Sequence, residues 1–105
     1  MINILFTSAG RRIELIQEFQ KAKKNKNIKG KIICADMNEL APALYFADKS
    51  YIIPPIKDLN YIKELKNICK KENISLIIPT IDTELEVLAN NINEFHSIGT
   101  DVLVS

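Results

Sequence analysis

The sequence predicts an α/β fold: a Rossmann-like, doubly wound sheet of five parallel strands in the order 3-2-1-4-5, with helices on both faces. Short apolar blocks alternate along the chain with longer segments in which apolar residues recur every three or four positions. The blocks do not alternate with polar residues, which is typical of strands covered on both faces. Right-handed crossovers, with a reversal of direction after the third strand, then lead to this strand order.

The predicted strands are short and rich in β-branched residues. They cover residues 2–6, 31–35, 51–53, 76–78 and 102–104. Helical spacing predicts helices over residues 11–24, 59–72 and 83–95, and a shorter helix that begins at Pro42, a residue suited to a first helical turn. Asp58 and Asp82 stand at positions expected for N-caps, and Gly99 is expected to end the last helix.

The composition is typical of a small soluble domain. The 105 residues predict a single domain, and the 47% hydrophobic and 26% charged residues are the ordinary mix of a soluble one. A net charge of +1 offers no basic field for nucleic acid or an anionic membrane. Cys34 and Cys69 lie among apolar residues and are interpreted as reduced core thiols of a cytoplasmic protein. No apolar run near the N-terminus is long enough for a signal peptide or a membrane span.

The loop after the first strand is the first candidate site, because ligands of such sheets bind at the carboxyl ends of the strands. It contains one glycine, Gly10, and lacks both the dinucleotide fingerprint G-x-G-x-x-G and the Walker pattern. A small-residue turn that opens a helix can still hold an anion, and Arg11 or Arg12 can add a bidentate clamp. Ser8, Gly10, Arg11 and Arg12 are therefore predicted to bind substrate. The alternative is that Gly10 only permits the turn and both arginines lie on the surface.

Acidic and hydroxyl residues follow two other predicted strands. Asp36 ends the second strand, where Rossmann proteins hold a ribose, and is the candidate cofactor residue; without the glycine pattern, a turn or capping role is favoured. Thr80 and Asp82 are predicted to face the same crevice as the arginines, where Asp82 would meet a substrate amine. Glu84 is interpreted as an acidic residue of a first helical turn. No His, Cys and Asp set has metal-ligand spacing, and no nucleophile–base pair is visible.

Four stretches of the chain resemble the ATP-grasp ligases related to the large chain of carbamoyl-phosphate synthase. They are residues 4–12, residues 35–36 with 40–44 and 47–49, residues 76–85, and residues 98–105. The likeness is to the N-terminal domain that precedes the ATP-grasp fold and forms one wall of the active site. It implies an enzyme that activates a carboxylate as an acyl phosphate and passes it to an amine or ammonia. It also implies that ATP and Mg²⁺ are held by later domains, with no cofactor bound tightly here.

From this resemblance we expect residues 1–105 to be one pre-ATP-grasp domain, the N-terminal fragment of a longer protein, and inactive alone. Its partners would be the missing ATP-grasp domains and a small-molecule substrate; an apolar face left open by their absence would also allow a homodimer. The alternative is a standalone small-molecule or nucleotide-binding module, motivated by Asp36 and the loop of residues 8–12. A receiver domain is disfavoured, because the third strand ends in Ile53-Pro54-Pro55 without an Asp.

Overall fold

The five strands form one parallel sheet in the order β3-β2-β1-β4-β5, as predicted. The structure is a computed structural model and describes residues 1–8, 12–39 and 41–104. The strands are β1 (Asn3–Thr7), β2 (Ile32–Asp36), β3 (Lys49–Ile52), β4 (Ile74–Pro79) and β5 (Asp101–Val102). The order reverses between β1 and β4, so the ends of these two strands and of β2 meet at the edge where ligands are expected.

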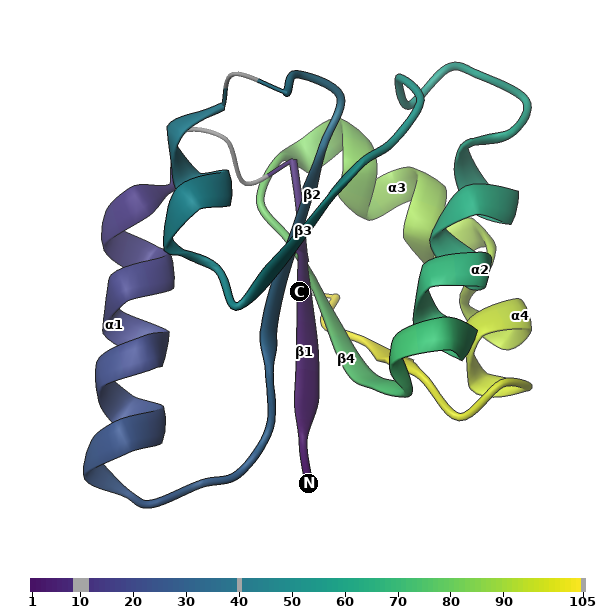
Figure 1. Ribbon diagram of the computed structural model, residues 1–105. Coiled ribbons are helices and arrows are strands. Elements are labelled where there is room, and N and C mark those ends of the chain that lie inside the picture. Colours follow the sequence, from purple (N-terminus) through teal and green to yellow (C-terminus); the bar gives the residue numbers. More distant parts are fainter. Residues whose placement is uncertain (9–11, 40, 105) are drawn as a thin grey trace.

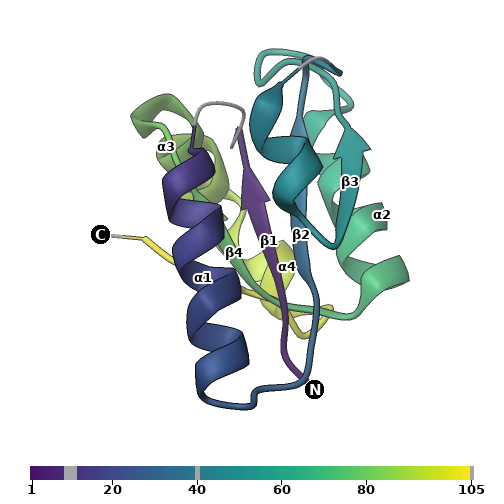
Figure 2. The same ribbon diagram turned by 60° about the vertical axis from the view of Figure 1, so that its left-hand side comes forward.

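Helices cover both faces of the sheet. They are α1 (Ile13–Asn25), the 3₁₀-helix η1 (Pro42–Phe46), α2 (Tyr61–Glu72), α3 (Asp82–Asn90) and α4 (Ile92–His96). Helix α1 and η1 lie on one face, and α2, α3 and α4 lie on the other (Figures 1 and 2). None of the helices in the described ranges is both long and apolar enough to span a membrane.

Neighbouring residues of the central strands fill two separate cores. Leu5 of β1 packs into the core beneath α2, α3 and α4, whereas Phe6 packs into the core beneath α1 and η1. Both side chains are fully buried, and the Phe6 ring meets Phe19 of α1 edge to face at a centroid distance of 4.9 Å. Side chains in a strand point alternately to opposite faces, so a strand buried on both faces needs a continuous apolar block.

The edge strands depart from the prediction that every strand is covered on both faces. In β3 only Tyr51 is half-buried, and Ile52 is 55% exposed. Strand β5 is two residues long, and the following Leu103 and Val104 are exposed. Each of these strands has one neighbour in the sheet, so the apolar block does not produce the same coverage there as in the centre.

The last predicted helix is two helices, not one. It ends at Asn90 and restarts at Ile92, because the side-chain amide of Asn91 donates a hydrogen bond of 2.8 Å to the carbonyl of Val87. Asn side chains that bind nearby backbone groups compete with the helical hydrogen-bond pattern. The last helix ends at His96, and Gly99 closes the turn that follows it: Gly99 has a φ of 83°, and the N–H of Thr100 reaches the carbonyl of Phe95 at 3.0 Å.

The predicted N-caps are wrong. The N-cap of α2 is Asn60 and that of α3 is Ile81, and neither of these described residues makes a side-chain cap hydrogen bond. The Asp58 carboxylate instead accepts from the N–H of Asn60 at 2.8 Å, which forms a turn before the helix. Strand β4 is followed so closely by α3 that extended Ile81 leads directly into the helix, with Asp82 as its first residue.

Acidic pH should lower the stability of the fold by protonating Glu72, at the end of α2. Its buried carboxylate lies 2.7 Å from Nζ of Lys49 and accepts a hydrogen bond from the Tyr51 hydroxyl. The hydrogen bonds from Lys49 and then Tyr51 lower the pKa of Glu72 from its ordinary value of 4.5. A lowered pKa contributes stability that is present above pH 4.5 and is lost as the pH falls below it.

We therefore expect Glu72→Gln to lower the free energy of unfolding at pH 7 and to flatten its decline between about pH 5 and pH 3. Urea unfolding at a series of pH values measures both effects. The matched control is Glu18→Gln, which removes an exposed carboxylate of α1. An unchanged acid dependence in Glu72→Gln would show that the lowered pKa does not contribute to stability.

Candidate functional site

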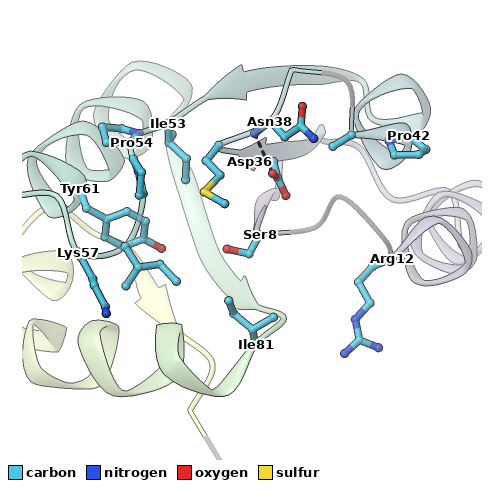
Figure 3. A pocket seen from close by; sticks show the side chains of 14 residues that line it. Ser8, Arg12, Asp36, Asn38, Pro42, Ile53, Pro54, Lys57, Tyr61 and Ile81 are labelled. Carbon is cyan, nitrogen blue, oxygen red and sulfur yellow. Dashed lines mark hydrogen bonds between the residues drawn. The ribbon is translucent and has the colours of Figure 1, made fainter.

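A pocket of about 990 Å³ opens at the carboxyl edge of the sheet (Figure 3). Its lining comes from the segments that follow β1, β2, β3 and β4, together with the starts of η1 and α2. These residues are Ser8, Arg12, Asp36, Met37, Asn38, Ala41, Pro42, Ile53, Pro54, Pro55, Ile56, Lys57, Tyr61 and Ile81. The pocket therefore lies where strand order predicts a ligand site, with polar groups set among apolar walls.

Three predicted site residues line this one pocket: Ser8, Arg12 and Asp36. Ser8 directly follows β1 and adopts a φ of 52°. Arg12 is the N-cap residue of α1, and its Nη2 donates a 3.2 Å hydrogen bond to the carbonyl of Thr80. The guanidinium is exposed and has five N–H donors, so besides this bond to the described chain it can bind a ligand.

The other predicted binding residues have different positions. The Thr80 hydroxyl lies 2.9 Å from the carbonyl oxygen of Thr7 and 2.7 Å from that of Ser8, so it joins the end of β4 to the end of β1 without lining the pocket. Asp82 is exposed at the start of α3 and is also outside the lining. Gly10 and Arg11 lie outside the described residues. Binding roles for these four residues stay predictions, as do those of the three residues that line the pocket.

Asp36 has the turn role considered for it and also lines the pocket, while its role as a cofactor residue stays a prediction. Its Oδ1 accepts a 3.0 Å hydrogen bond from the N–H of Asn38, which is the turn role favoured from the sequence. Its carboxylate also lines the pocket, near the end of β2 (Figure 3). A carboxylate offers several acceptor positions, so a turn residue of this kind can also contact a ligand.

Sequence reasoning missed a buried hydrogen-bonded cluster beside the pocket. Glu84 is fully buried and accepts hydrogen bonds from the hydroxyls of Thr7 (2.6 Å), Ser8 (2.6 Å) and Tyr61 (2.5 Å). It does stand in the first turn of α3, as interpreted, but its side chain points into the molecule. A signal was available, because Glu84 lies four residues before buried Leu88 and so shares its face of the helix.

Tyr61 is the other residue that the sequence did not single out. It is 1% exposed, lies at the start of α2 and forms part of the pocket wall. Burial and then the Glu84 carboxylate raise the pKa of its hydroxyl well above the usual value, so Tyr61 is a neutral donor to Glu84. Its spacing to Leu65 and Ile68 marks it as part of the buried stripe of α2.

Metal and thiol chemistry have no support at this edge. Among the described residues, no group of three or more His, Cys, Asp or Glu side chains is arranged to hold a metal ion. Cys34 and Cys69 are buried free thiols, as predicted, and burial raises their pKa to about 12 and about 11. His96 lies 3.4 Å from Asp101. Asp101 is the first residue of β5, so this pair lies at the amino ends of the strands, away from the pocket.

The comparison with known protein families covers almost the whole chain. Residues 4–103 match the family described as the PylC-like, N-terminal domain. This chain belongs to that family. The PylC-like domain is the N-terminal domain of ATP-grasp enzymes, which confirms the resemblance recognised in the sequence. None of the curated proteins matches this PylC-like domain significantly in sequence.

Two solved structures share the fold of the PylC-like domain. A multifunctional pyruvate carboxylase from Rhizobium etli matches with a TM-score of 0.58 and 20% identity, covering 97% of this chain and 10% of that one. A dTDP-glucose 4,6-dehydratase from Bacillus anthracis, in complex with NAD, matches with a TM-score of 0.61 and 13% identity, covering 99% and 36%. At these identities the likeness shows the fold alone, and the chain spans a minor part of either protein.

Proposed function

We propose that this chain is the N-terminal, substrate-side domain of a carbamoyl-phosphate-synthase-like ATP-grasp ligase that joins a carboxylate to an amine or ammonia. In this proposal residues 1–105 are one domain of a longer cytoplasmic protein and are inactive alone. The observation that carries it is the PylC-like match over residues 4–103. The pocket at the carboxyl edge then forms the part of the active site that this domain contributes.

The pocket has the groups that such a substrate needs. The Arg12 guanidinium suits a carboxylate or an acyl phosphate, because it can form paired, charge-assisted hydrogen bonds. The Asp36 carboxylate suits an amine, and Asp82 remains a second candidate for that group at the start of α3. Ile53 and Ile81 supply apolar wall to the same pocket, which suits the apolar part of a substrate.

The reaction follows from the resemblance. A carboxylate oxygen attacks the γ-phosphorus of ATP and ADP leaves; the amine nitrogen then attacks the acyl carbon, and phosphate leaves. The described residues do not supply a metal-binding set, and the sequence has no phosphate-binding glycine pattern. The resemblance implies that the other domains of the protein hold ATP and Mg²⁺, while this domain binds and orients the substrate.

Two assays test this function. The full-length protein should bind ATP with Mg²⁺ and release ADP when supplied with its carboxylate, and added hydroxylamine should trap the acyl phosphate as a hydroxamate. The 105-residue domain, titrated with ATP by calorimetry, should show no saturable binding. Failure of the full-length protein to bind ATP would contradict the proposal.

The second candidate, a standalone nucleotide-binding module, is favoured by one observation. Asp36 lines the pocket at the end of β2, where Rossmann proteins place the acidic residue that holds a ribose. On this alternative, the 105-residue domain alone should bind ATP or NAD with micromolar affinity. The same calorimetric titration, repeated with NAD, therefore distinguishes the two functions.

A further inference from the structure

The buried carboxylate of Glu84 gathers hydroxyl groups from three parts of the fold. It accepts hydrogen bonds from Thr7 on β1, from Ser8 just after that strand and from Tyr61 on α2, all between 2.5 and 2.6 Å. Within the described part of the chain, no Lys, Arg or His nitrogen lies within ion-pair distance of it. All three hydroxyls donate to Glu84, so each of them directs its only proton at this carboxyl group.

Two of the three donors also form the pocket. Ser8 and Tyr61 line it from different elements, and Figure 3 shows the Ser8 hydroxyl pointing toward the side of the pocket where Tyr61 lies. The third donor, Thr7, is fully buried behind them. Glu84 therefore fixes the orientation of groups on two pocket walls without lining the pocket itself.

Ser8 is held firmly in an unfavourable conformation. Its φ of 52° is in the left-handed region, which residues other than glycine rarely adopt. Its hydroxyl binds Glu84, and its carbonyl oxygen accepts the Thr80 hydroxyl at 2.7 Å. A strained residue that is fixed from two sides next to a pocket indicates that the direction of its side chain matters for a ligand.

The hydrogen bond from Ser8 to Glu84 limits which ligand groups Ser8 can bind. With its only proton directed at Glu84, the Ser8 oxygen offers lone pairs and no donor to the pocket. A hydroxyl that donates a hydrogen bond is also a better acceptor itself, because hydrogen bonds in a chain polarise one another. Asp36, on the same pocket, is a second acceptor.

We propose that Glu84 is a positioning residue that makes the Ser8 oxygen a pure acceptor and so selects an ammonium group over a hydroxyl at this part of the pocket. The inference rests on the proposed function in that it takes this pocket as the substrate site. It assigns the amine end of the substrate to the side of Ser8 and Asp36, and leaves its acidic end to Arg12. An ammonium group carries three donors and no acceptor, which matches this set of acceptors.

The test compares two probes that differ in one group, 5-aminopentanoate and 5-hydroxypentanoate, binding to the full-length protein. We expect the amine probe to bind about fivefold more tightly or better, because its hydrogen bonds are charge-assisted. Ser8→Ala should lower this ratio by about threefold or more, since it removes the acceptor. Glu84→Gln should lower it by about twofold or more, because it replaces one acceptor oxygen with an N–H donor, so one hydroxyl can no longer donate there.

Thr100→Val is the matched control. It removes another fully buried hydroxyl, which donates to the carbonyl of Ile74 at the opposite edge of the sheet, and should leave the ratio unchanged. If Glu84→Gln does not fold, Ser8→Ala decides the question. Wild-type protein that prefers the hydroxyl probe, or binds neither probe, overturns the inference, as does an unchanged ratio in Ser8→Ala.

The proposed function is tested separately by ADP release from the same protein. ADP release with an unchanged probe ratio in the variants would overturn the role of Glu84 and leave the ligase function standing. A ratio that falls as expected in a protein that never binds ATP would overturn the ligase function and support the role of Glu84.

Discussion

Gly30→Ala is expected to lower the stability of the fold severely. Gly30 precedes β2 with a φ of 147°, and an alanine Cβ there would lie 1.7 Å from the carbonyl oxygen of Ile2 and 2.5 Å from its carbonyl carbon. These are backbone atoms, and moving them would break the hydrogen bonds from Ile2 to Lys29 (2.9 Å) and from Ile4 to Lys31 (3.0 Å). We expect a loss of about 3 kcal/mol or more, a large part of the stability of a small domain.

Gly99→Ala is the matched control for this prediction. Gly99 also has a left-handed φ, of 83°, but an alanine Cβ at this position would meet no other part of the described chain within 4 Å. Its substitution should therefore cost about 1 kcal/mol, from backbone conformation alone. Urea unfolding followed by circular dichroism compares the two variants. Equal midpoints for Gly30→Ala and Gly99→Ala would show that the close approach to Ile2 is not a constraint on folding.

The central part of the fold could be predicted because its cause is local. Leu5 and Phe6 are adjacent and both fully buried, and two neighbouring apolar residues in a strand require cover on both faces. The exposure of the outermost strands could not be predicted in this way. Ile52 is as apolar as the residues of β1 and yet is 55% exposed, because exposure depends on which strands become neighbours.

The place of the candidate site could also be predicted, whereas its hydrogen bonds could not. Parallel strands bring their carboxyl ends to one edge, which places Ser8, Arg12 and Asp36 on one pocket. The link between Thr7 and Glu84 joins residues 77 positions apart, and only the completed fold brings them together. The spacing of residues after β4 likewise did not distinguish Thr80 and Asp82, which lie outside the lining, from Ile81, which belongs to it.

Arg12→Ala is expected to have the largest effect on activity and little effect on folding. A cation at the N-terminus of a helix is unfavourable by a few tenths of a kcal/mol, up to about 1 kcal/mol, so the fold gains little from Arg12. The hydrogen bond that it donates to the carbonyl of Thr80 is exposed. The isolated domain should therefore be as stable as before, or slightly more stable. A bound anionic substrate would make the contribution of Arg12 favourable, because its negative charge would lie beside the arginine and the N-terminus of α1.

If the full-length protein is the proposed ligase, Arg12→Ala should lower its kcat/KM for the carboxylate substrate about tenfold or more, equivalent to about 1.4 kcal/mol of transition-state stabilisation. Arg12→Lys should restore only part of the loss, since an ammonium group lacks the planar fork of a guanidinium. The same test applies to Arg11, which stays a predicted binding residue outside the described part of the chain.

The most direct test of the substrate-side assignment is kcat/KM for carboxylate-dependent ADP release by full-length wild-type, Arg12→Ala and Arg12→Lys protein, measured beside the urea stability of the same variants in the 105-residue domain. We predict a fall of about tenfold or more for Arg12→Ala, partial recovery for Arg12→Lys and unfolding free energies no lower than wild type. Unchanged kinetics in Arg12→Ala, together with a loss of more than about 1 kcal/mol in stability, would show that Arg12 supports the fold and does not bind the substrate.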